Sequence, residues 1–346
     1  MNIAVVGVGA LGTIVGAMLN SKGIKADLVD DYQENINGIR EKGLQVVGNI
    51  EVKATGEAYH IDELDKQYDL VLLLTKQFEN EKILTKLLPH LHADSIVCTL
   101  QNGAPEENVA EYVGKERTIG GAVGFGATWL GPGVSELTSE LKVLENFAFE
   151  IGETNGEITE RIKKVNEILQ HVGGSEIMDN LPGVRWAKIL MNAAFSGMSA
   201  ALGCTYGEVM DDPRGHWCLV HIADETIRVA EAQGIKFVEM QGVDFSDLRL
   251  KDDSPEEVLN KFPFMKEVWG RHRKLKASML QDLEKGRTTE ITHINGVVSD
   301  KGKELGIPTP FNDTVVRLVK QKEANKEVVT PQYIDEFFQK VNSSVV

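Results

Sequence analysis

The sequence contains no long hydrophobic run and no excess of basic residues. None of its apolar stretches approaches the ~18 residues that a membrane helix needs. Its 37 Lys and Arg residues are outnumbered by 52 Asp and Glu residues, which gives a formal net charge of −15. Because an acidic surface repels nucleic acid and anionic lipid, we expect neither as a partner. A site for an anionic ligand therefore needs local positive charge.

Cysteine is also scarce, and no C-x-x-C pair is present. We expect Cys98, Cys204 and Cys218 to be buried free thiols in a reducing, cytoplasmic compartment. No cationic segment precedes Met1, and the first expected strand follows at once, which disfavours a secretory signal peptide. Neither an H-x-x-x-H pair nor a carboxylate cluster with metal-ligand spacing occurs, so no metal site is expected.

The first half of the chain alternates strand patterns with helix patterns. We expect strands at 2–8, 26–31, 68–76, 94–103 and 147–153. The run YDLVLLLTK at 68–76 has almost no polar interruption, which is typical of a parallel strand covered on both faces. This alternation predicts the α/β class.

From about residue 178 the patterns become helical. We expect helices at 184–202, 214–233, 262–285, 289–304 and 311–322. The acidic stretch QGVDFSDLRLKDDSPEEV at 241–258 is poor in strong helix formers and is interpreted as an excursion between helices. The sequence thus predicts an α/β domain over 1–180 and an all-helical domain over 181–346.

A glycine motif, G-x-G-x-x-G, follows the first expected strand and opens an amphipathic helix. Gly7 permits a sharp turn, Gly9 lets the main chain approach a pyrophosphate, and Gly12 allows the helix to pack closely on the strand. The helix N-terminus, with Ala10 and Leu11, offers N–H groups and partial positive charge to phosphates. We therefore predict a Rossmann-type dinucleotide-binding domain; a glycine turn without a ligand is the alternative.

The end of the second expected strand bears on the type of cofactor. Asp30 lies 18 residues after Gly12, near the position that faces the adenine ribose. A carboxylate there accepts hydrogen bonds from the ribose hydroxyls and repels a 2′-phosphate, so NAD(H) is favoured and NADP(H) is the alternative. The nearest downstream cation, Arg40, already belongs to the next helix, and Asp31 is expected to be a solvated charge.

A polar stripe runs along the otherwise apolar segment 184–203. Lys188, Asn192, Ser196 and Ser199 fall within roughly 80° of arc at 100° per residue. A lysine on a surface helix is usually only solvated. Here its neighbours are amides and hydroxyls on a helix too apolar to be exposed, which favours a water-filled cleft in which an ammonium can polarise a carbonyl.

A third informative stretch covers residues 278–298. Gly286 is expected to end one helix, and Thr288 or Thr289 to cap the next. Glu290 would then lie in the first turn, where the helix dipole favours a carboxylate, and a purely structural role there is the alternative. His293 is expected to be a packed or surface histidine.

The residues together resemble the ketopantoate reductase (2-dehydropantoate 2-reductase) family. The matching stretches are GVGALG at 7–12, TKQF at 75–78, LQNG at 100–103, RWAKILMNAAFSGMSA at 185–200, SMLQDLEKGRTTEITHINGVV at 278–298 and LGIPTPFN at 305–312. They follow the family order and span nearly the whole chain. The resemblance implies an oxidoreductase that reduces ketopantoate to D-pantoate with NAD(P)H, and a homodimer formed through the helical domain.

The resemblance also assigns roles to individual residues. Lys188 would be the general acid that protonates the ketone oxygen, and Glu290 would face it across the cleft. This chemistry is reasonable by itself, because hydride addition builds negative charge on the oxygen and one proton must be supplied.

The remaining roles concern binding. Asn102 would lie beside the nicotinamide, and Lys76 near the cofactor at the cleft entrance. Asn192 and Ser278 would hydrogen-bond polar groups of the substrate, and we place Ser196 with them.

The chain departs from the family pattern in three ways. Ser196 stands where the family typically has a second Asn, Asp30 and Asp31 replace a cation found in many members, and the segment near 241–262 is about 20 residues longer than usual. We expect Phe262, Phe264 and Trp269 to anchor this segment by packing. A D-2-hydroxyacid dehydrogenase acting on another branched or bulky 2-keto acid is therefore the alternative enzyme, and a dinucleotide-sensing protein is the non-enzymatic one.

Overall fold

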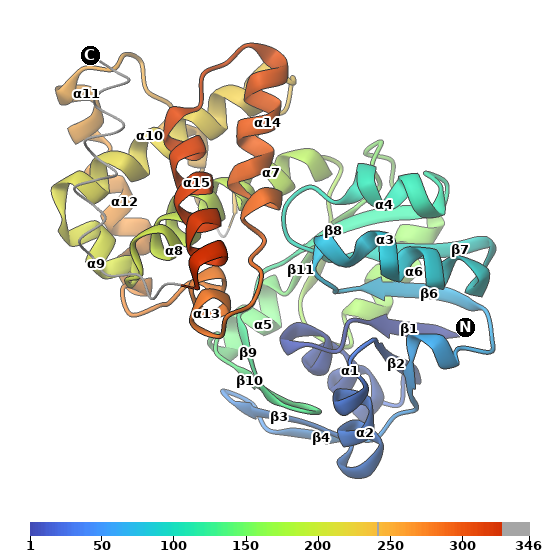
Figure 1. Ribbon diagram of the computed structural model, residues 1–346. Helices are drawn as coiled ribbons and strands as arrows, with labels where there is room; N and C mark the ends of the chain where they lie inside the picture. The colour runs from blue at the N-terminus through green and yellow to red at the C-terminus, as the bar shows by residue number, and fades with distance from the viewer. Residues whose placement is uncertain (241, 327–346) are drawn as a thin grey trace. The chain divides into compact units, whose positions relative to one another are not determined.

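The chain divides into two compact units, Met1–Leu181 and Pro182–Val346 (Figure 1). The computed structural model describes residues 1–240 and 242–326. Gln241 of the expected excursion and residues 327–346 of the expected helical domain lie outside the described residues.

Unit 1 is built on an eight-stranded sheet. In spatial order its strands are β12 (Ser175–Ile177), β11 (Phe149–Gly152), β8 (Thr118–Val123), β7 (Leu91–Thr99), β6 (Tyr68–Leu73), β1 (Ile3–Val6), β2 (Ala26–Asp30) and β5 (Ala58–His60). All neighbouring strands are parallel except β8 and β11. The predicted α/β class with a parallel sheet is confirmed.

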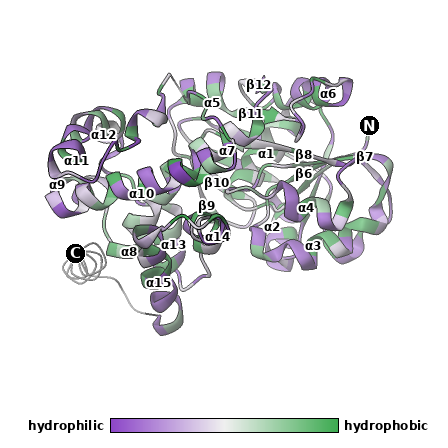
Figure 2. Cartoon of the chain, turned by 90° about the horizontal axis from the view of Figure 1, so that it is seen from above, coloured by the Kyte–Doolittle hydropathy of each residue, from purple (hydrophilic) through white to green (hydrophobic). Residues whose placement is uncertain are grey.

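Apolar residues on both faces of the sheet explain its uninterrupted hydrophobic strands. Along β1, Ile3 and Val5 join one core cluster and Ala4 and Val6 the other, as alternation along a strand requires. Helices α1 (Ala10–Ser21), α5 (Leu141–Phe147) and α6 (Glu160–Leu169) contribute to the first cluster, and α3 (Asn80–Leu87) and α4 (Glu106–Val113) to the second. Hydrophilic and hydrophobic residues share α3, α4 and α6 in Figure 2, which suits helices that cover a sheet with one face.

A second, four-stranded sheet in unit 1 was not predicted. Its strands, in spatial order, are β4 (Val52–Ala54), β3 (Leu44–Gly48), β10 (Val134–Leu137) and β9 (Ala127–Gly131), and α2 (Gln33–Lys42) precedes it in the chain. These strands are short and only partly buried, so they lack the apolar runs that reveal the main sheet.

Unit 2 is helical in its described residues, which confirms the second part of the predicted architecture. Its helices are α7 (Leu181–Met191), α8 (Met198–Leu202), α9 (Tyr206–Asp211), α10 (Pro213–Ala232), α11 (Pro255–Asn260), α12 (Phe262–Trp269), α13 (Ser278–Glu284), α14 (Asn295–Leu305) and α15 (Pro310–Asn325). The expected anchoring is confirmed: Trp269 stacks on Phe195 at 4.2 Å between ring centroids, Phe262 stacks on His216, and Phe264 packs against the same core.

The prediction of a single helix over 262–285 is wrong. It is divided into α12 and α13 because carbonyl groups between them are used elsewhere: the N–H groups of Tyr206 and Gly207 donate to Leu275 O and Arg273 O. The chain thereby supplies acceptors to the start of α9 instead of continuing its own helix.

The helix predicted over 289–304 begins only at Asn295. A 3₁₀ turn, η7 (Ile291–His293), comes first, and Ile294 adopts φ −119° and ψ −89°, outside the helical region. The expectation that Glu290 lies in the first turn of a helix is therefore wrong, since it immediately precedes η7.

Cys98, Cys204 and Cys218 are buried and form no disulfide with one another, as expected. Across residues 1–240 and 242–326, no helix combines the length and apolar character that crossing a bilayer demands.

Two buried histidines on α10 lead to a prediction about pH. His216 and His221 stack on Phe262 and Phe311 at 4.0 and 4.4 Å, and burial lowers the pKa of each to about 4. Between pH 6.5 and 4 the unfolded chain takes up protons that the folded chain does not, so these residues should make the protein less stable as pH falls through this window.

The His221→Phe variant should therefore lose less of its thermal stability between pH 7 and pH 5 than the unmodified protein. Comparing the two proteins cancels the contribution of other titrating groups. A His171→Gln variant, altered at an exposed histidine, is the control. Equal losses in all three proteins would contradict the prediction.

Candidate functional site

The expected cofactor residues all follow neighbouring strands of the main sheet at their carboxyl ends. The glycine loop follows β1, Asp30 ends β2, Lys76 follows β6 and Asn102 follows β7. These strands are adjacent in the order β7-β6-β1-β2 and run parallel, so their carboxyl ends meet at one edge. Ligands of open α/β sheets bind at this edge.

The three glycines meet different steric demands. Gly7 has φ +92°, and a Cβ there would lie 2.6 Å from the backbone nitrogen of Thr75. A Cβ on Gly12 would collide with the carbonyl group of Gly7, so only glycine lets α1 pack this closely on the loop. A Cβ on Gly9, by contrast, would meet no protein atom within 4 Å.

This geometry fits a dinucleotide pyrophosphate. Gly9 is exposed and is the N-cap residue of α1, and no side chain caps that end. The half-buried Ala10 and Leu11 form the start of α1, where the first N–H groups lack intrahelical partners. The open space at Gly9 and the uncapped helix end together provide room and donors for phosphate oxygens.

Asp30 supports the loop from the side. Its Oδ2 accepts hydrogen bonds from Val8 N at 2.9 Å and Asn35 Nδ2 at 3.0 Å, and its Oδ1 accepts one from Tyr32 N at 3.1 Å. Burial raises the pKa of Asp30, while these donors act in the opposite direction. Since a carboxylate offers about four lone-pair sites, Oδ1 can accept one further hydrogen bond.

The prediction that Asp31 is a solvated charge is wrong, because both its side chain and its main chain have partners. Its carboxylate forms an ion pair with Lys82, and its carbonyl group contacts His60 Nε2 at 3.1 Å. Two carboxylates therefore lie at the end of β2.

A buried amide network that was not predicted connects the loops after β6 and β7. Gln101 Nε2 donates to Thr75 O at 2.9 Å and to Asn80 Oδ1 at 2.7 Å, and Gln77 Nε2 donates to Asn102 O. Lys76 and Asn102 are half-buried within these two loops. Nothing in the spacing of the glutamines within TKQF and LQNG indicates that they connect the two loops.

In unit 2, only the first two residues of the polar stripe, Lys188 and Asn192, lie in the accessible part of their helical segment. Within 183–202, only Lys188, Met191 and Asn192 are not buried. Lys188 lies in the last turn of α7, and Asn192 begins a π-helical turn, η4 (Asn192–Gly197). The spacing that assumed a regular α-helix is therefore interrupted, at a type of distortion that is frequent in functional sites.

The two serines of the stripe lie deeper. Ser196 Oγ contacts Tyr206 Oη at 2.8 Å and Asn192 Oδ1 at 3.5 Å. Ser199 Oγ donates to Cys204 O at 2.6 Å, which gives it a structural partner at the end of α8.

Ser278 belongs to a helix that packs directly against η4, whereas Glu290 precedes a turn that packs against two neighbours of η4, α14 and α15. Ser278 is the exposed first residue of α13, which packs against α8 and η4. Glu290 is 3% exposed and precedes η7, which packs against α14 and α15. Next to it, Thr289 donates to Glu323 Oε1 through both its N–H group and its hydroxyl.

An asparagine from α14 supports the π-helical turn. Asn295 Nδ2 donates to Ala193 O at 3.1 Å and to Asn312 Oδ1 at 2.9 Å. A Cβ on Gly197 would lie 2.5 Å from Asn295 Oδ1, so glycine is needed for this approach.

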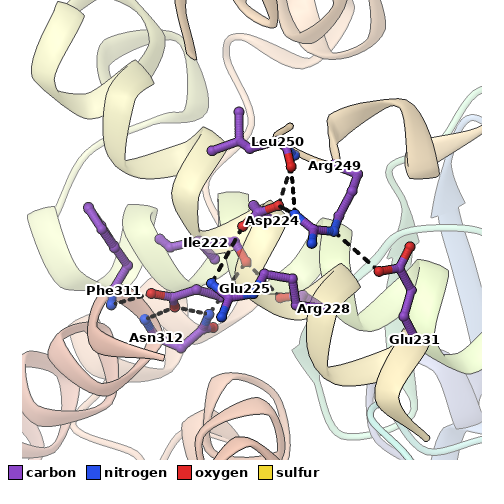
Figure 3. A network of polar contacts seen from close by, with 10 residues as sticks. Ile222, Asp224, Glu225, Arg228, Glu231, Arg249, Leu250, Phe311 and Asn312 are labelled. Carbon is purple, nitrogen blue, oxygen red and sulfur yellow. Dashed lines mark hydrogen bonds and ion pairs between the residues drawn. The ribbon is translucent and has the colours of Figure 1, made fainter. Parts of the chain in front are cut away.

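Behind this asparagine pair lies the carboxylate of Glu225 (Figure 3). It accepts hydrogen bonds from Phe311 N, Asn312 N and Asn312 Nδ2 at 2.8–2.9 Å, and burial raises its pKa to about 8. The adjacent Asp224 instead contacts Leu250 N and Arg249. These connections join α10, α15, α14 and η4 into one buried network.

Among the described residues, no group of three or more His, Cys, Asp and Glu side chains is arranged to hold a metal ion.

The parallel sheet and its glycine loop define a dinucleotide-binding protein of the Rossmann class, followed by a helical unit. The chain belongs to the ketopantoate reductase family and is an oxidoreductase of that family. The N-terminal family description, ketopantoate reductase PanE/ApbA, matches residues 3–149, and the C-terminal one matches residues 180–323.

Individual relatives agree with this assignment. A 2-dehydropantoate 2-reductase from Pyrococcus horikoshii is 30% identical over 326 residues, covering 94% of this chain and 98% of that protein. One from Archaeoglobus fulgidus is 28% identical, covering 93% and 98%. A structure of D-mandelate dehydrogenase with NADH and anilino(oxo)acetate has a TM-score of 0.79 and 28% identity, covering 94% of this chain and 99% of that one.

The glycine geometry leads to a matched pair of predictions. The Gly9→Ala variant should still fold, with a Tm within about 4 °C of the original, because its Cβ meets no protein atom within 4 Å and only its ψ of −148° lies outside the regions that alanine prefers. It should nevertheless bind NADH at least about tenfold more weakly in a fluorescence titration, because the methyl group occupies the proposed pyrophosphate space.

Gly12→Ala should instead destabilise the protein, by roughly 1–3 kcal/mol, because the methyl group overpacks the loop. Gly270→Ala, whose Cβ likewise meets no protein atom within 4 Å, is the control for Gly9→Ala. Normal NADH affinity in Gly9→Ala would show that the pyrophosphate lies elsewhere.

Proposed function

We propose that the protein reduces a branched or bulky 2-keto acid with NADH, and that ketopantoate is the leading substrate and D-pantoate the product. The observation that carries the proposal is the accessible pair of Lys188 and Asn192 on an otherwise buried segment, in a chain whose relatives are named 2-dehydropantoate 2-reductases. When bound, the nicotinamide supplies the hydride.

The residues of unit 2 would supply the polar groups that the reaction needs. As the keto carbon accepts hydride, the carbonyl electrons move onto the oxygen, and the Lys188 ammonium donates a proton to it. Asn192 and Ser278 hydrogen-bond the substrate's oxygens, Ser196 acts with Asn192, and Glu290 positions Lys188 or a substrate hydroxyl.

The residues of unit 1 support NADH rather than NADPH. Asp30 retains one acceptor position on Oδ1 for a ribose hydroxyl, and Asp31 adds a second carboxylate that a 2′-phosphate would have to approach. Lys76 and Asn102, at the same sheet edge, are assigned to the cofactor as well. The similar D-mandelate dehydrogenase structure is a ternary one with NADH and anilino(oxo)acetate.

A second candidate is a D-2-hydroxyacid dehydrogenase that acts on a different 2-keto acid. It is favoured by Ser196, which is shorter than the asparagine typical of the family, and by the similarity to D-mandelate dehydrogenase. Measuring NADH oxidation with ketopantoate, benzoylformate and aliphatic branched 2-keto acids distinguishes the two candidates by their kcat/KM values. No turnover of any of these acids would reject both.

Lys188→Ala should lower kcat for the preferred keto acid by ~10²–10⁴, the usual loss when an acid catalyst is removed. NADH binding should stay within about twofold, since the change removes no proposed cofactor contact. Lys285→Ala, altered at an exposed lysine outside the proposed site, should retain full activity. Full activity in Lys188→Ala would exclude this residue from the mechanism.

Asp30→Ala should weaken NADH binding by about tenfold more than NADPH binding, because it removes a ribose acceptor and a charge that repels the 2′-phosphate. Titrating both cofactors separates this effect from a disturbed loop, since losing the bond to Val8 N would weaken both equally. An equal loss, or a preference of the unmodified protein for NADPH, would refute the assignment.

A further inference from the structure

Tyr206 lies at the polar stripe although it comes from a different helix. It is the first residue of α9, and the preceding Thr205 forms a capping box with Glu208. Its own N–H group donates to Leu275 O at 3.2 Å. The ring packs against Phe195 with 5.3 Å between centroids, and the residue is only 9% exposed. Main-chain and ring contacts therefore fix where the hydroxyl lies.

The Tyr206 hydroxyl begins a chain of hydrogen bonds with a defined direction. Asn192 Oδ1 can only accept, so the single proton of Ser196 Oγ points to it across 3.5 Å. Ser196 Oγ then accepts from Tyr206 Oη at 2.8 Å. Burial raises the pKa of Tyr206 to about 12, which keeps this hydroxyl protonated and able to donate.

The consequence falls on the amide of Asn192. With Oδ1 turned toward Ser196, both protons of Nδ2 remain for another acceptor, and no acceptor for them is recorded in the part of the chain that the structure describes. Asn192 is half-exposed, unlike the residues around it on η4. Asn192 therefore presents a hydrogen-bond donor to any ligand that reaches the accessible residues Lys188, Met191 and Asn192.

We propose that Tyr206 is a positioning residue that, through Ser196, holds Asn192 with its NH₂ group toward an acceptor oxygen of the substrate. The proposal rests on the proposed function for the identity of that substrate, a 2-keto acid. A carboxylate oxygen suits this donor, because it accepts two hydrogen bonds and keeps its charge throughout the reaction. The contact is then equally strong before and during hydride transfer, so its loss raises KM more than it lowers kcat.

The Tyr206→Phe variant tests the proposal because it removes the hydroxyl and keeps the ring against Phe195. We expect KM for the preferred keto acid to rise by about five- to tenfold, as the loss of an ordered hydrogen bond predicts, with kcat and KM for NADH within about twofold. Ser196→Ala should produce the same split, which guards against a folding defect specific to either variant. Tyr68→Phe is the matched control: it loses a buried tyrosine hydroxyl bonded to Asp27 at 2.9 Å in unit 1 and should change none of these constants.

A double-mutant cycle separates positioning from a general structural role. In an Asn192→Ala background, Tyr206→Phe should cause no further rise in KM, because the residue through which it acts is absent. Additive effects, or an unchanged KM in Tyr206→Phe with the unmodified enzyme fully active, would overturn this inference alone. No turnover of any 2-keto acid by the unmodified enzyme would overturn the proposed function and this inference with it.

Discussion

The absence of a Cβ at two glycines governs the geometry of the glycine loop in unit 1 and of the π-helical turn in unit 2. In unit 1, α1 can follow the first strand so closely only because Gly12 has no side chain to meet the Gly7 carbonyl group. In unit 2, Asn295 reaches the π-helical turn only because Gly197 leaves room for its amide. In each case the close approach fixes polar groups of the main chain: the N–H groups at the start of α1 in one, and the Ala193 carbonyl group that accepts from Asn295 in the other. A side chain at either glycine would displace these main-chain groups.

Two consecutive acidic residues on α10 connect the π-helical turn to other parts of unit 2. Asp224 binds the segment that carries Arg249 and Leu250, and Glu225 binds the first N–H groups of α15 (Figure 3). The N-cap residue of α15 makes no side-chain cap hydrogen bond, so the Glu225 oxygens accept from these N–H groups in place of a local cap. From Glu225 the hydrogen bonds continue through Asn312 and Asn295 to the main chain of η4. Part of the segment 242–262 is thus attached to α10, the same helix whose Glu225 leads to η4.

What the sequence could predict was local. The glycine loop, the uninterrupted β6 and the helices α10 and α15 follow from patterns within about 20 residues, and the structure agrees with them. The break between α12 and α13 could not be found in this way, because it is caused by N–H groups of α9, some 70 residues earlier in the chain. Tyr206 was missed for the same reason: its relation to Ser196 depends on how α9 is capped and packed, and no spacing encodes it.

The difference between local motifs and contacts of distant segments also explains why family membership identifies the reaction more readily than the substrate. Every 2-keto acid offers a ketone and a carboxylate, which an ammonium and amide donors recognise regardless of the rest of the molecule. Discrimination between acyl groups then depends on packing, where a methylene is worth only ~1–3 kcal/mol. Next to Ser196, the fully buried ring of Phe195 packs against both Tyr206 and Trp269. These rings come from separate elements, so the packing beneath the polar stripe depends on residues distant in the sequence, whereas the lysine and the glycine loop each belong to one short motif.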